Sequence, residues 1–322
     1  MWYTESSRFL TEQGTTMKNK ANIITFSSRG FGRTQEGILA SLERRLAELH
    51  RLSPDLICFP EEVLISGGDK NNPRWEENNA AALALMRRYA ALYRTNIVCN
   101  LEEAAPDYPG KRYNTSYVID RAGGIIGKYR KRYITYRAIA GDGIPGEKFA
   151  VVDTDIGRIG LMICFDIGWR EDWQRLADMG ADIVVWPAAY HGGNLINAYA
   201  AIHMYYVITS VWNGESRIVN PLGDDIAEGH QWDSFVSGTI YPTGEVFHFD
   251  NHFDHLPRLR EAYGDRIFVQ VEGKGNTFHL GVNDPALSVA EIKKTFGMQS
   301  YADYHRQYGE ENARLRVQYP ED

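Results

Sequence analysis

The sequence predicts an α/β protein with two β-sheets and helices on their outer faces. Expected strands and helices alternate from residue 22 to residue 101 and again from residue 158 to residue 211, and hairpins connect the two series. No sequence repeat and no low-complexity linker divides the chain. One domain of this class therefore accounts for most of the 322 residues.

The first series consists of short apolar runs that alternate with segments whose apolar residues recur at helical spacing. Thr34 is in position to cap the first helix, whose apolar face runs from Ile38 to Leu49. Strands are expected over residues 22–27, 56–59 and 96–101, and a second helix over 76–94.

The middle and the second series follow the same rules. Hairpins are expected from 114–120 to 124–129 and, across Pro242-Thr243-Gly244, from 237–241 to 245–249. The other expected strands are 149–153, 158–164, 181–186, 205–211, 216–220 and 266–271, and the helices are 169–179 and 194–204. From Ser288 the chain is predicted to be helical and polar.

Composition and charge exclude several classes of protein. The chain is 43% hydrophobic and 24% charged, as ordinary globular proteins are. Its formal net charge of −7 argues against nucleic-acid binding and against a basic helix on a membrane surface. No apolar run is long enough to span a membrane, and residues 1–20 lack the apolar core of a secretory signal. A cytoplasmic location is therefore expected.

Cys164 lies where an expected strand gives way to a helix. A thiol at this point lies near the positive end of the helix dipole, which is expected to lower its pKa and favour the nucleophilic thiolate. The other cysteines, Cys58 and Cys99, lie inside apolar strands and are interpreted as core residues. The spacing of the three fits neither a disulfide framework nor a metal site.

Two further strand ends carry side chains that could serve this cysteine. Glu61 follows the strand over 56–59, and Lys131 follows the strand over 124–129. A carboxylate in a partly desolvated pocket can accept the thiol proton. A lysine, together with the N–H of Phe165 after the cysteine, can stabilise an oxyanion.

The segments around these residues resemble the nitrilase superfamily of carbon–nitrogen hydrolases. Phe59-Pro60-Glu61 resembles the family's glutamate motif, Gly127 to Lys131 its lysine motif, and Gly160 to Asp166 its cysteine motif. Tyr113-Asn114-Thr115, Pro187-Ala188-Ala189 and Trp212-Asn213 also match. The resemblance extends from about residue 22 to residue 271 and follows the family's order of motifs.

The resemblance implies a four-layer α-β-β-α sandwich, a Glu61–Lys131–Cys164 triad, and neither a metal nor an organic cofactor. It implies a hydrolase domain over residues 21–285, preceded by a poorly ordered extension over 1–20 and followed by a helical extension over 286–322. The C-terminal extension is expected at the interface of a homodimer or a higher even oligomer.

The departures from the family's pattern concern the substrate. The family often has a further glutamate between its lysine and cysteine motifs, but residues 134–145 contain none. Phe165-Asp166 resembles the amidase and N-carbamoyl hydrolase branches, whereas nitrilases tend to have Trp-Glu there. A small amide or carbamoyl substrate is therefore expected. The predicted substrate-contacting residues are Tyr136, Trp169, Tyr190, His191, Asn194 and Asn213.

Other interpretations remain open at this point. The chain could be a nitrilase, a Cys–His hydrolase with His191 or His203 as the base, or a non-catalytic member of the family that acts as a scaffold. A histidine-rich segment from His248 to His255 has residue types that suit a divalent metal, although it has the composition of a polar loop.

Overall fold

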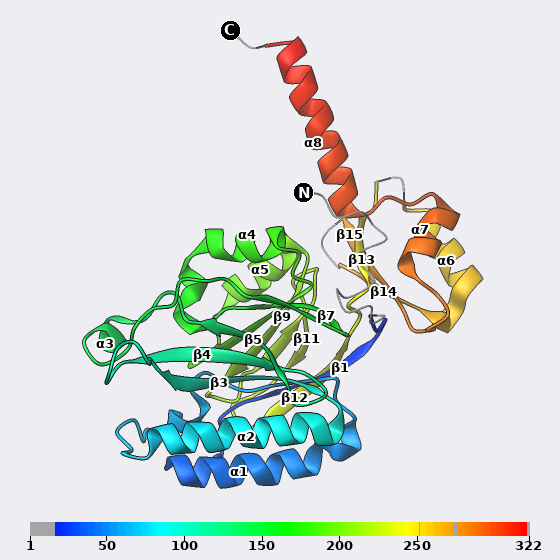
Figure 1. The fold of residues 1–322 in the computed structure, drawn as a ribbon. Coiled ribbons are helices and arrows are strands. Elements are labelled where there is room, and N and C mark those ends of the chain that lie inside the picture. Colours follow the sequence, from blue (N-terminus) through cyan, green and yellow to red (C-terminus); the bar gives the residue numbers. More distant parts are fainter. Residues whose placement is uncertain (1–16, 251, 273–275, 321–322) are drawn as a thin grey trace. The chain divides into compact units, whose positions relative to one another are not determined.

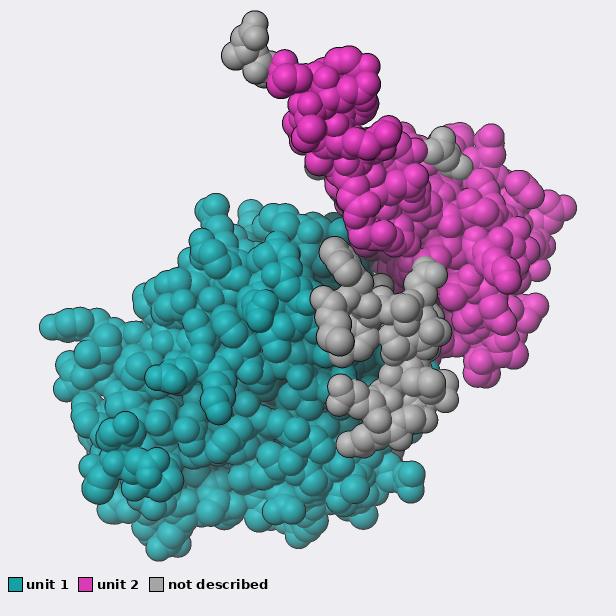
Figure 2. Space-filling view, turned by 45° about the horizontal axis from the view of Figure 1, so that its top comes forward, with its two compact units in different colours: residues 1–17, 21–240 teal, residues 18–20, 241–322 magenta. Residues whose placement is uncertain are grey.

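The computed structural model describes residues 17–250, 252–272 and 276–320, which form two compact units (Figure 2). Unit 1 contains residues 17 and 21–240, and unit 2 contains residues 18–20 and 241–320. The two units divide between Ile240 and Tyr241, whereas the domain limits at 20 and 285 stay predictions. Most of the predicted N-terminal extension, residues 1–16, lies outside the described residues.

Unit 1 contains two six-stranded sheets, both mixed. The first has the order β12-β1-β2-β3-β4-β5, in which β1, β2 and β3 are parallel and the other pairs are antiparallel. Its strands are β1 (Ala21–Phe26), β2 (Leu56–Cys58), β3 (Asn96–Ala104), β4 (Arg112–Ile119), β5 (Ile125–Arg130) and β12 (Phe235–Ile240).

The second sheet has the order β11-β10-β9-β8-β7-β6, with β7, β8 and β9 parallel. Its strands are β6 (Val151–Thr154), β7 (Gly157–Leu161), β8 (Ile183–Ala188), β9 (Tyr206–Val211), β10 (Arg217–Val219) and β11 (Asp225–Glu228). Both sheets thus have parallel strands at their centres, whose carboxyl ends lie at one edge.

Helices cover the outer face of each sheet, so that unit 1 has four layers (Figure 1). Alternate residues of a strand point to opposite faces, and the burial follows this rule: Ile23 packs between the sheets, whereas Ile24 packs against the helices α1 (Gln35–Glu48) and α2 (Trp75–Tyr93). The helices α4 (Arg170–Asp178) and α5 (Asn194–His203) cover the second sheet. The predicted α-β-β-α arrangement is confirmed.

Capping of the first helix follows the sequence prediction. Thr34 has extended backbone angles, and its side-chain oxygen accepts a hydrogen bond from the N–H of Gly37 at 3.1 Å. The short helix α3 (Tyr136–Ile139) begins in the same way at Thr135. It lies in the loop that leads from β5 toward β6.

Unit 2 is built on a three-stranded antiparallel sheet with the order β13-β15-β14. The strands are β13 (Glu245–His248), β14 (Ile267–Val271) and β15 (Thr277–Val282), and the helices are α6 (His255–Tyr263), α7 (Val289–Phe296) and α8 (Tyr301–Gln318). Phe247, Leu259, Phe278 and Ile292 belong to its own apolar core. The predicted helical C-terminal segment is confirmed, and α8 buries none of its side chains in the described chain.

Two predictions about this region are wrong, and one strand was missed. The hairpin across Pro242-Thr243-Gly244 does not form, because β12 pairs with β1 while β13 pairs with β15. The strand β15 was not predicted, and it pairs with both β13 and β14 in the small sheet. The segment interpreted as a polar loop after residue 254 begins a helix, α6. Within the described residues, no helix is long and apolar enough to cross a membrane.

Candidate active site

Three predicted side chains, Glu61, Lys131 and Cys164, lie just beyond the carboxyl ends of strands. Glu61 follows β2 and Lys131 follows β5, both in the first sheet, whereas Cys164 follows β7 in the second. All three are almost fully buried, with exposed fractions of 4%, 5% and 7%. The structure therefore brings together the three residues that the sequence singled out.

Lys131 and Glu61 form a buried ion pair. The distance from Lys131 Nζ to Glu61 Oε1 is 2.6 Å, and Asn114 Nδ2 donates to the same oxygen at 2.9 Å. Burial lowers the pKa of Lys131, but the negative charges of Glu61 and of a Cys164 thiolate raise it, and the net direction is upward. Lys131 is consequently a fixed positive charge.

A chain of amide side chains holds Glu61 in place. Asn100 Nδ2 donates to Asn114 Oδ1 at 2.9 Å, and Asn114 in turn donates to Glu61. Asn100 Oδ1 accepts the N–H of Glu62 at 2.5 Å. From the second sheet, Trp212 Nε1 donates to the main-chain oxygen of Glu61 at 2.7 Å. Both the carboxylate and the backbone of Glu61 are thus restrained.

The neighbouring Glu62 has an unusual backbone and an unusual acidity. Its φ of 40° lies in the left-handed region, which costs free energy for a residue with a side chain. Burial, followed by the carboxylates of Glu61 and Glu102, raises the pKa of Glu62 to about 8. A second carboxyl group that keeps its proton near neutral pH therefore adjoins the buried pair.

Cys164 is held at a sharp turn at the start of a 3₁₀ helix, Cys164–Gly168. Its φ is 45°, also in the left-handed region, and Trp186 Nε1 donates to its main-chain oxygen at 3.1 Å. The thiol is within hydrogen-bond reach of the Glu61 carboxylate and of the Ala189 N–H. The sulfur therefore has a proton acceptor on one side and a backbone donor on the other.

The prediction that the helix dipole lowers the pKa of Cys164 is wrong. Burial and the adjacent Glu61 carboxylate raise this pKa, and they outweigh Lys131 and the Ala189 N–H, which lower it. The 3₁₀ helix has only five residues, so its dipole is small. The resting site holds a neutral thiol beside a carboxylate, and the proton must be transferred during attack.

Comparison with known proteins agrees with this geometry. The sequence matches the carbon–nitrogen hydrolase family over residues 28–242, which is more than half of the chain. The chain belongs to this family, the nitrilase superfamily.

Curated relatives of this carbon–nitrogen hydrolase are distant. A deaminated glutathione amidase of Dictyostelium discoideum is 27% identical over 52% of this chain and 70% of its own length. The omega-amidase of Homo sapiens is 29% identical over 41% of this chain and 56% of its own length. With several of these relatives, the chain thus shares only about half of their length.

Solved structures share the fold. Nit3 of Saccharomyces cerevisiae has a TM-score of 0.62 at 19% identity and covers 77% of this chain and 96% of its own. An amidase from Nesterenkonia sp. has a TM-score of 0.59 at 20% identity, covering 71% of this chain and 92% of its own.

The predicted substrate-contacting residues differ in how close they lie to the three buried side chains and in how exposed they are. Tyr190 lies near the three buried side chains, since burial and the charge of Cys164 raise its pKa to about 12. Trp169 stacks on Tyr133 at 3.5 Å between ring centres and meets Phe165 edge to face. Tyr136 is 86% exposed on α3. Asn213 is exposed in the turn after β9.

His191 and Asn194 line a separate hollow of about 660 Å³. Glu215, Glu228, His230 and Trp232 are among its other walls. The hollow is bordered by the chain just after Ala189, whose N–H contacts the Cys164 sulfur, and just after Trp212, which holds Glu61.

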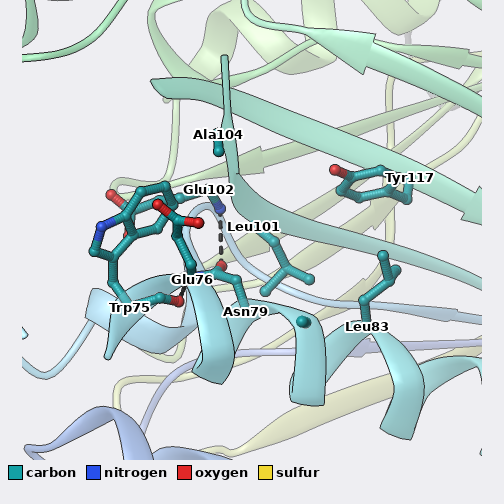
Figure 3. Close-up of a pocket in the computed structure, with 9 residues that line it drawn as sticks. Trp75, Glu76, Asn79, Leu83, Leu101, Glu102, Ala104 and Tyr117 are labelled. Atoms are coloured by element: carbon teal, nitrogen blue, oxygen red, sulfur yellow. Dashed lines mark hydrogen bonds between the residues drawn. The ribbon is translucent and has the colours of Figure 1, made fainter. Parts of the chain in front are cut away.

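A smaller hollow of about 190 Å³ lies between α2 and the strands β3 and β4 (Figure 3). Its walls include Leu83, Leu101 and Tyr117, and the N–H of Glu102 donates to Asn79 Oδ1 at 3.0 Å across it. None of the three candidate catalytic residues lines this hollow. It lies on the outer face of the first sheet, apart from the residues of the candidate site.

Sequence reasoning missed Asn100 and Ala189 as parts of the site. Asn100 is a fully buried polar residue that directly follows the apolar run Ile97-Val98-Cys99, and that contrast was the available signal. Ala189 acts through its backbone N–H, for which the side chain gives no signal beyond the Pro187-Ala188-Ala189 match. Cys58 and Cys99 are buried in the core, as predicted, and burial raises the pKa of each thiol.

Proposed function

We propose that this protein is a thiol hydrolase that cleaves the non-peptide C–N bond of a small amide or N-carbamoyl compound through a cysteine thioester. The observation that carries the proposal is the buried pair of Lys131 Nζ and Glu61 Oε1, 2.6 Å apart, beside the Cys164 thiol. Burying a charge costs on the order of several kcal/mol per ion before the attraction between the two ions is counted. A buried ion pair is therefore a poor way to stabilise a fold, and a role in chemistry explains it better.

In the first half of the reaction, Glu61 accepts the Cys164 proton as the sulfur bonds to the substrate carbon. The oxyanion that forms is stabilised by Lys131 and by the N–H of Phe165. The C–N bond then breaks, and Glu61 returns the proton to the departing ammonia or amine. The product of this half is a thioester on Cys164.

In the second half, Glu61 accepts a proton from a water molecule that attacks the thioester carbon. The C–S bond breaks, the acid is released, and the proton returns to the Cys164 sulfur. Water is the only co-reactant, so atoms and charge balance over the cycle. No metal or organic cofactor is required by these steps.

An amide or carbamoyl substrate is favoured over a nitrile by the names of the relatives. The similar curated proteins include a deaminated glutathione amidase and omega-amidases, and a solved Nesterenkonia amidase is described with acrylamide added to its active-site cysteine. The residues proposed to contact the rest of the substrate are Trp169, Tyr190, His191, Asn194 and Asn213. Tyr136 is retained as a contact for larger substrates only, because of its exposure.

The test is a panel of small amides, N-carbamoyl amino acids and nitriles with mass analysis of trapped intermediates. We expect acyl mass on the peptide containing Cys164 and none on the peptides containing Cys58 or Cys99, which serve as internal controls. Cys164→Ala should abolish turnover. Full turnover by that variant would refute the thiol mechanism, and turnover of nitriles alone would refute the choice of substrate.

We also propose that the protein forms a homodimer or a higher even oligomer through its C-terminal segment. In support, α8 buries no side chain in the described chain and exposes Tyr308, Leu315 and Val317. Sedimentation at micromolar concentration is the test, with truncation after Gly297 as the comparison. A monomeric full-length protein would contradict the proposal.

A further inference from the structure

Asp166 occupies a fully buried position between the strand end that carries Lys131 and the turn that carries Cys164. Its exposed fraction is 0%, although it is a carboxylate. No ion pair joins it to a cationic side chain within the described part of the chain. A carboxylate in such a place must be held by hydrogen-bond donors.

Three donors from two segments converge on this carboxylate. Asp166 Oδ2 accepts the Ile163 N–H at 2.9 Å and the Tyr129 hydroxyl at 2.7 Å. Asp166 Oδ1 accepts the Tyr133 N–H at 2.9 Å. Hydrogen bonds to a charged acceptor are about twice as strong as neutral ones, so these three bonds form a strong local connection.

These donors lie next to Lys131 and Cys164 in the chain. Tyr129 precedes Lys131 by two residues and Tyr133 follows it by two, so the carboxylate holds the chain on both sides of the lysine. Ile163 immediately precedes Cys164, whose backbone has a left-handed φ of 45°. One side chain therefore restrains the lysine of the first sheet and the cysteine turn that follows the second.

We propose that Asp166 is a positioning residue that sets the separation of Lys131 and Cys164 in the reaction cycle. This inference rests on the proposed function for its effect on turnover, but its effect on the reactivity of Cys164 does not depend on any substrate. Asp166 contacts none of the reacting atoms. It acts by holding the positive charge of Lys131 where that charge stabilises the Cys164 thiolate and the later oxyanion.

The acidity of Asp166 agrees with this geometry. Burial raises its pKa to about 6, against the three donors and the charge of Lys131, which lower it. The buried environment thus disfavours the ionised carboxylate that the hydrogen bonds stabilise. Ionisable groups with such shifted pKa values are typical of functional sites.

The first experiment compares the Asp166→Asn variant with the unchanged protein. Asparagine has nearly the same shape, but its amide nitrogen replaces one of the two oxygens that accept hydrogen bonds and cannot accept a bond itself. We expect kcat to fall about 10- to 100-fold while KM changes less than about twofold, because the binding surface is untouched. The second readout is the rate at which iodoacetamide alkylates Cys164. We expect slower alkylation and a higher midpoint pH, since the sulfur loses the fixed charge of Lys131.

A second pair of variants, with smaller structural changes, tests the inference even if Asp166→Asn fails to fold. Tyr129→Phe removes one donor from Asp166 and should reduce both kcat and the alkylation rate about 3- to 10-fold. Tyr205→Phe is the matched control, because Tyr205 is as deeply buried, at 1% exposed, and its hydroxyl has no hydrogen-bond partner among the described residues. It should change neither rate.

The alkylation readout separates this inference from the proposed function. Folded Asp166→Asn and Tyr129→Phe variants that alkylate as fast as the unchanged protein, or faster, at the same midpoint pH would overturn the positioning role. An unchanged protein that turns over no amide or carbamoyl compound, yet whose alkylation depends on Asp166, would overturn the proposed function alone. A Tyr205→Phe variant as slow as Tyr129→Phe would assign the effect to packing and would also overturn the inference.

Discussion

The candidate active site of unit 1 and the histidine cluster of unit 2 both bring polar side chains together, but these side chains use their partners differently. Among the rings of His248, His252 and His255, that of His252 alone is buried. In unit 1 the side chains hold one another, as Lys131, Asn114 and the Cys164 thiol all do with the Glu61 carboxylate. In unit 2 the histidine rings hold the main chain. His252 Nδ1 lies 2.8 Å from the His248 oxygen, and its Nε2 accepts the Gln299 N–H at 3.0 Å.

The remaining rings of the cluster follow the same pattern. His255 Nε2 lies 2.9 Å from the Phe296 oxygen, and the His248 ring stacks near Tyr304 of α8. Burial is the main cause that lowers the pKa of His252, so its ring stays neutral. The comparison teaches that residue types alone do not define a reactive site. Side chains bonded to the backbone support the fold, whereas side chains bonded to one another leave acid–base groups available.

The largest expected effect comes from removing the positive charge of the unit 1 site. Lys131→Met should lower kcat/KM by at least about 10³-fold, or about 4 kcal/mol, because the oxyanion loses a charged donor and Glu61 loses its partner. Steady-state kinetics measure the effect. Lys128→Met, in the same basic run but on an exposed salt bridge with Glu103, should stay within about twofold. Equal losses in both variants would contradict the assignment.

The next effect concerns the free energy of unfolding that is lost when Asp166 of unit 1 ionises. Burial raises the folded-state pKa of Asp166 from 3.8 to about 6, so between these values the folded protein binds more protons than the unfolded chain. Ionisation of this group therefore reduces stability as the pH rises, with nothing lost below about pH 3.8 and the full cost reached above about pH 6.

Urea unfolding at pH values from 4.5 to 7.5 tests this sign. The stability of the unchanged protein relative to Asp166→Asn should fall toward pH 6 and level off above it, by about 2 kcal/mol between pH 4.5 and pH 7.5. A relative stability that rises with pH would show that Asp166 is instead stabilised by its charge. Burial lowers the pKa values of His252 and His279 in unit 2, so these two rings should add no such slope above pH 6.5.

Asn114 should have a smaller effect, because it positions the base without carrying charge. Asn114→Ala leaves Glu61 paired with Lys131 but removes the bond at 2.9 Å that sets its orientation. We expect kcat to fall about 10- to 30-fold, or about 2 kcal/mol, with little change in KM. A change confined to KM would place Asn114 in substrate binding instead.

The smallest effect is expected in unit 2. His252→Ala removes two hydrogen bonds to the main chain and should cost about 1–2 kcal/mol in the local stability of that unit, with kcat/KM unchanged. Hydrogen exchange of the β13 and β15 amides reports the first quantity and kinetics the second. Lost activity in a variant whose unit 2 remains protected would break the contrast between the two clusters.

Much of the site was predictable because its key residues stand at fixed places in local motifs. Glu61 and Cys164 each follow an apolar run, and an apolar run ends visibly in the sequence, whereas Lys131 lies in a basic run and is singled out only by its place in the motif. The contacts among them were not predictable from the residues, since Glu61 and Cys164 are more than a hundred positions apart. The resemblance to a family supplied that proximity.

The failures have a common physical cause, which is non-local pairing. The expected hairpin around Thr243 has good turn residues, yet β12 finds its partner in β1, more than two hundred residues earlier. The acidity of Cys164 was misjudged because local helix geometry was visible in the sequence, whereas burial and the neighbouring Glu61 were not. Asp166 was seen as a motif residue, but two of its three donors come from a segment that only the fold brings to it.

The hydrogen bond from Trp212 to the Glu61 main chain has a consequence for how this sequence can change over evolution. It is one of several hydrogen bonds that join the two sheets across their shared apolar layer, and the base and the nucleophile come from opposite sheets. The thickness of that layer therefore sets the span that the proton must cross. Core substitutions such as Ile159→Val, normally judged by stability alone, will here be selected for reaction rate as well.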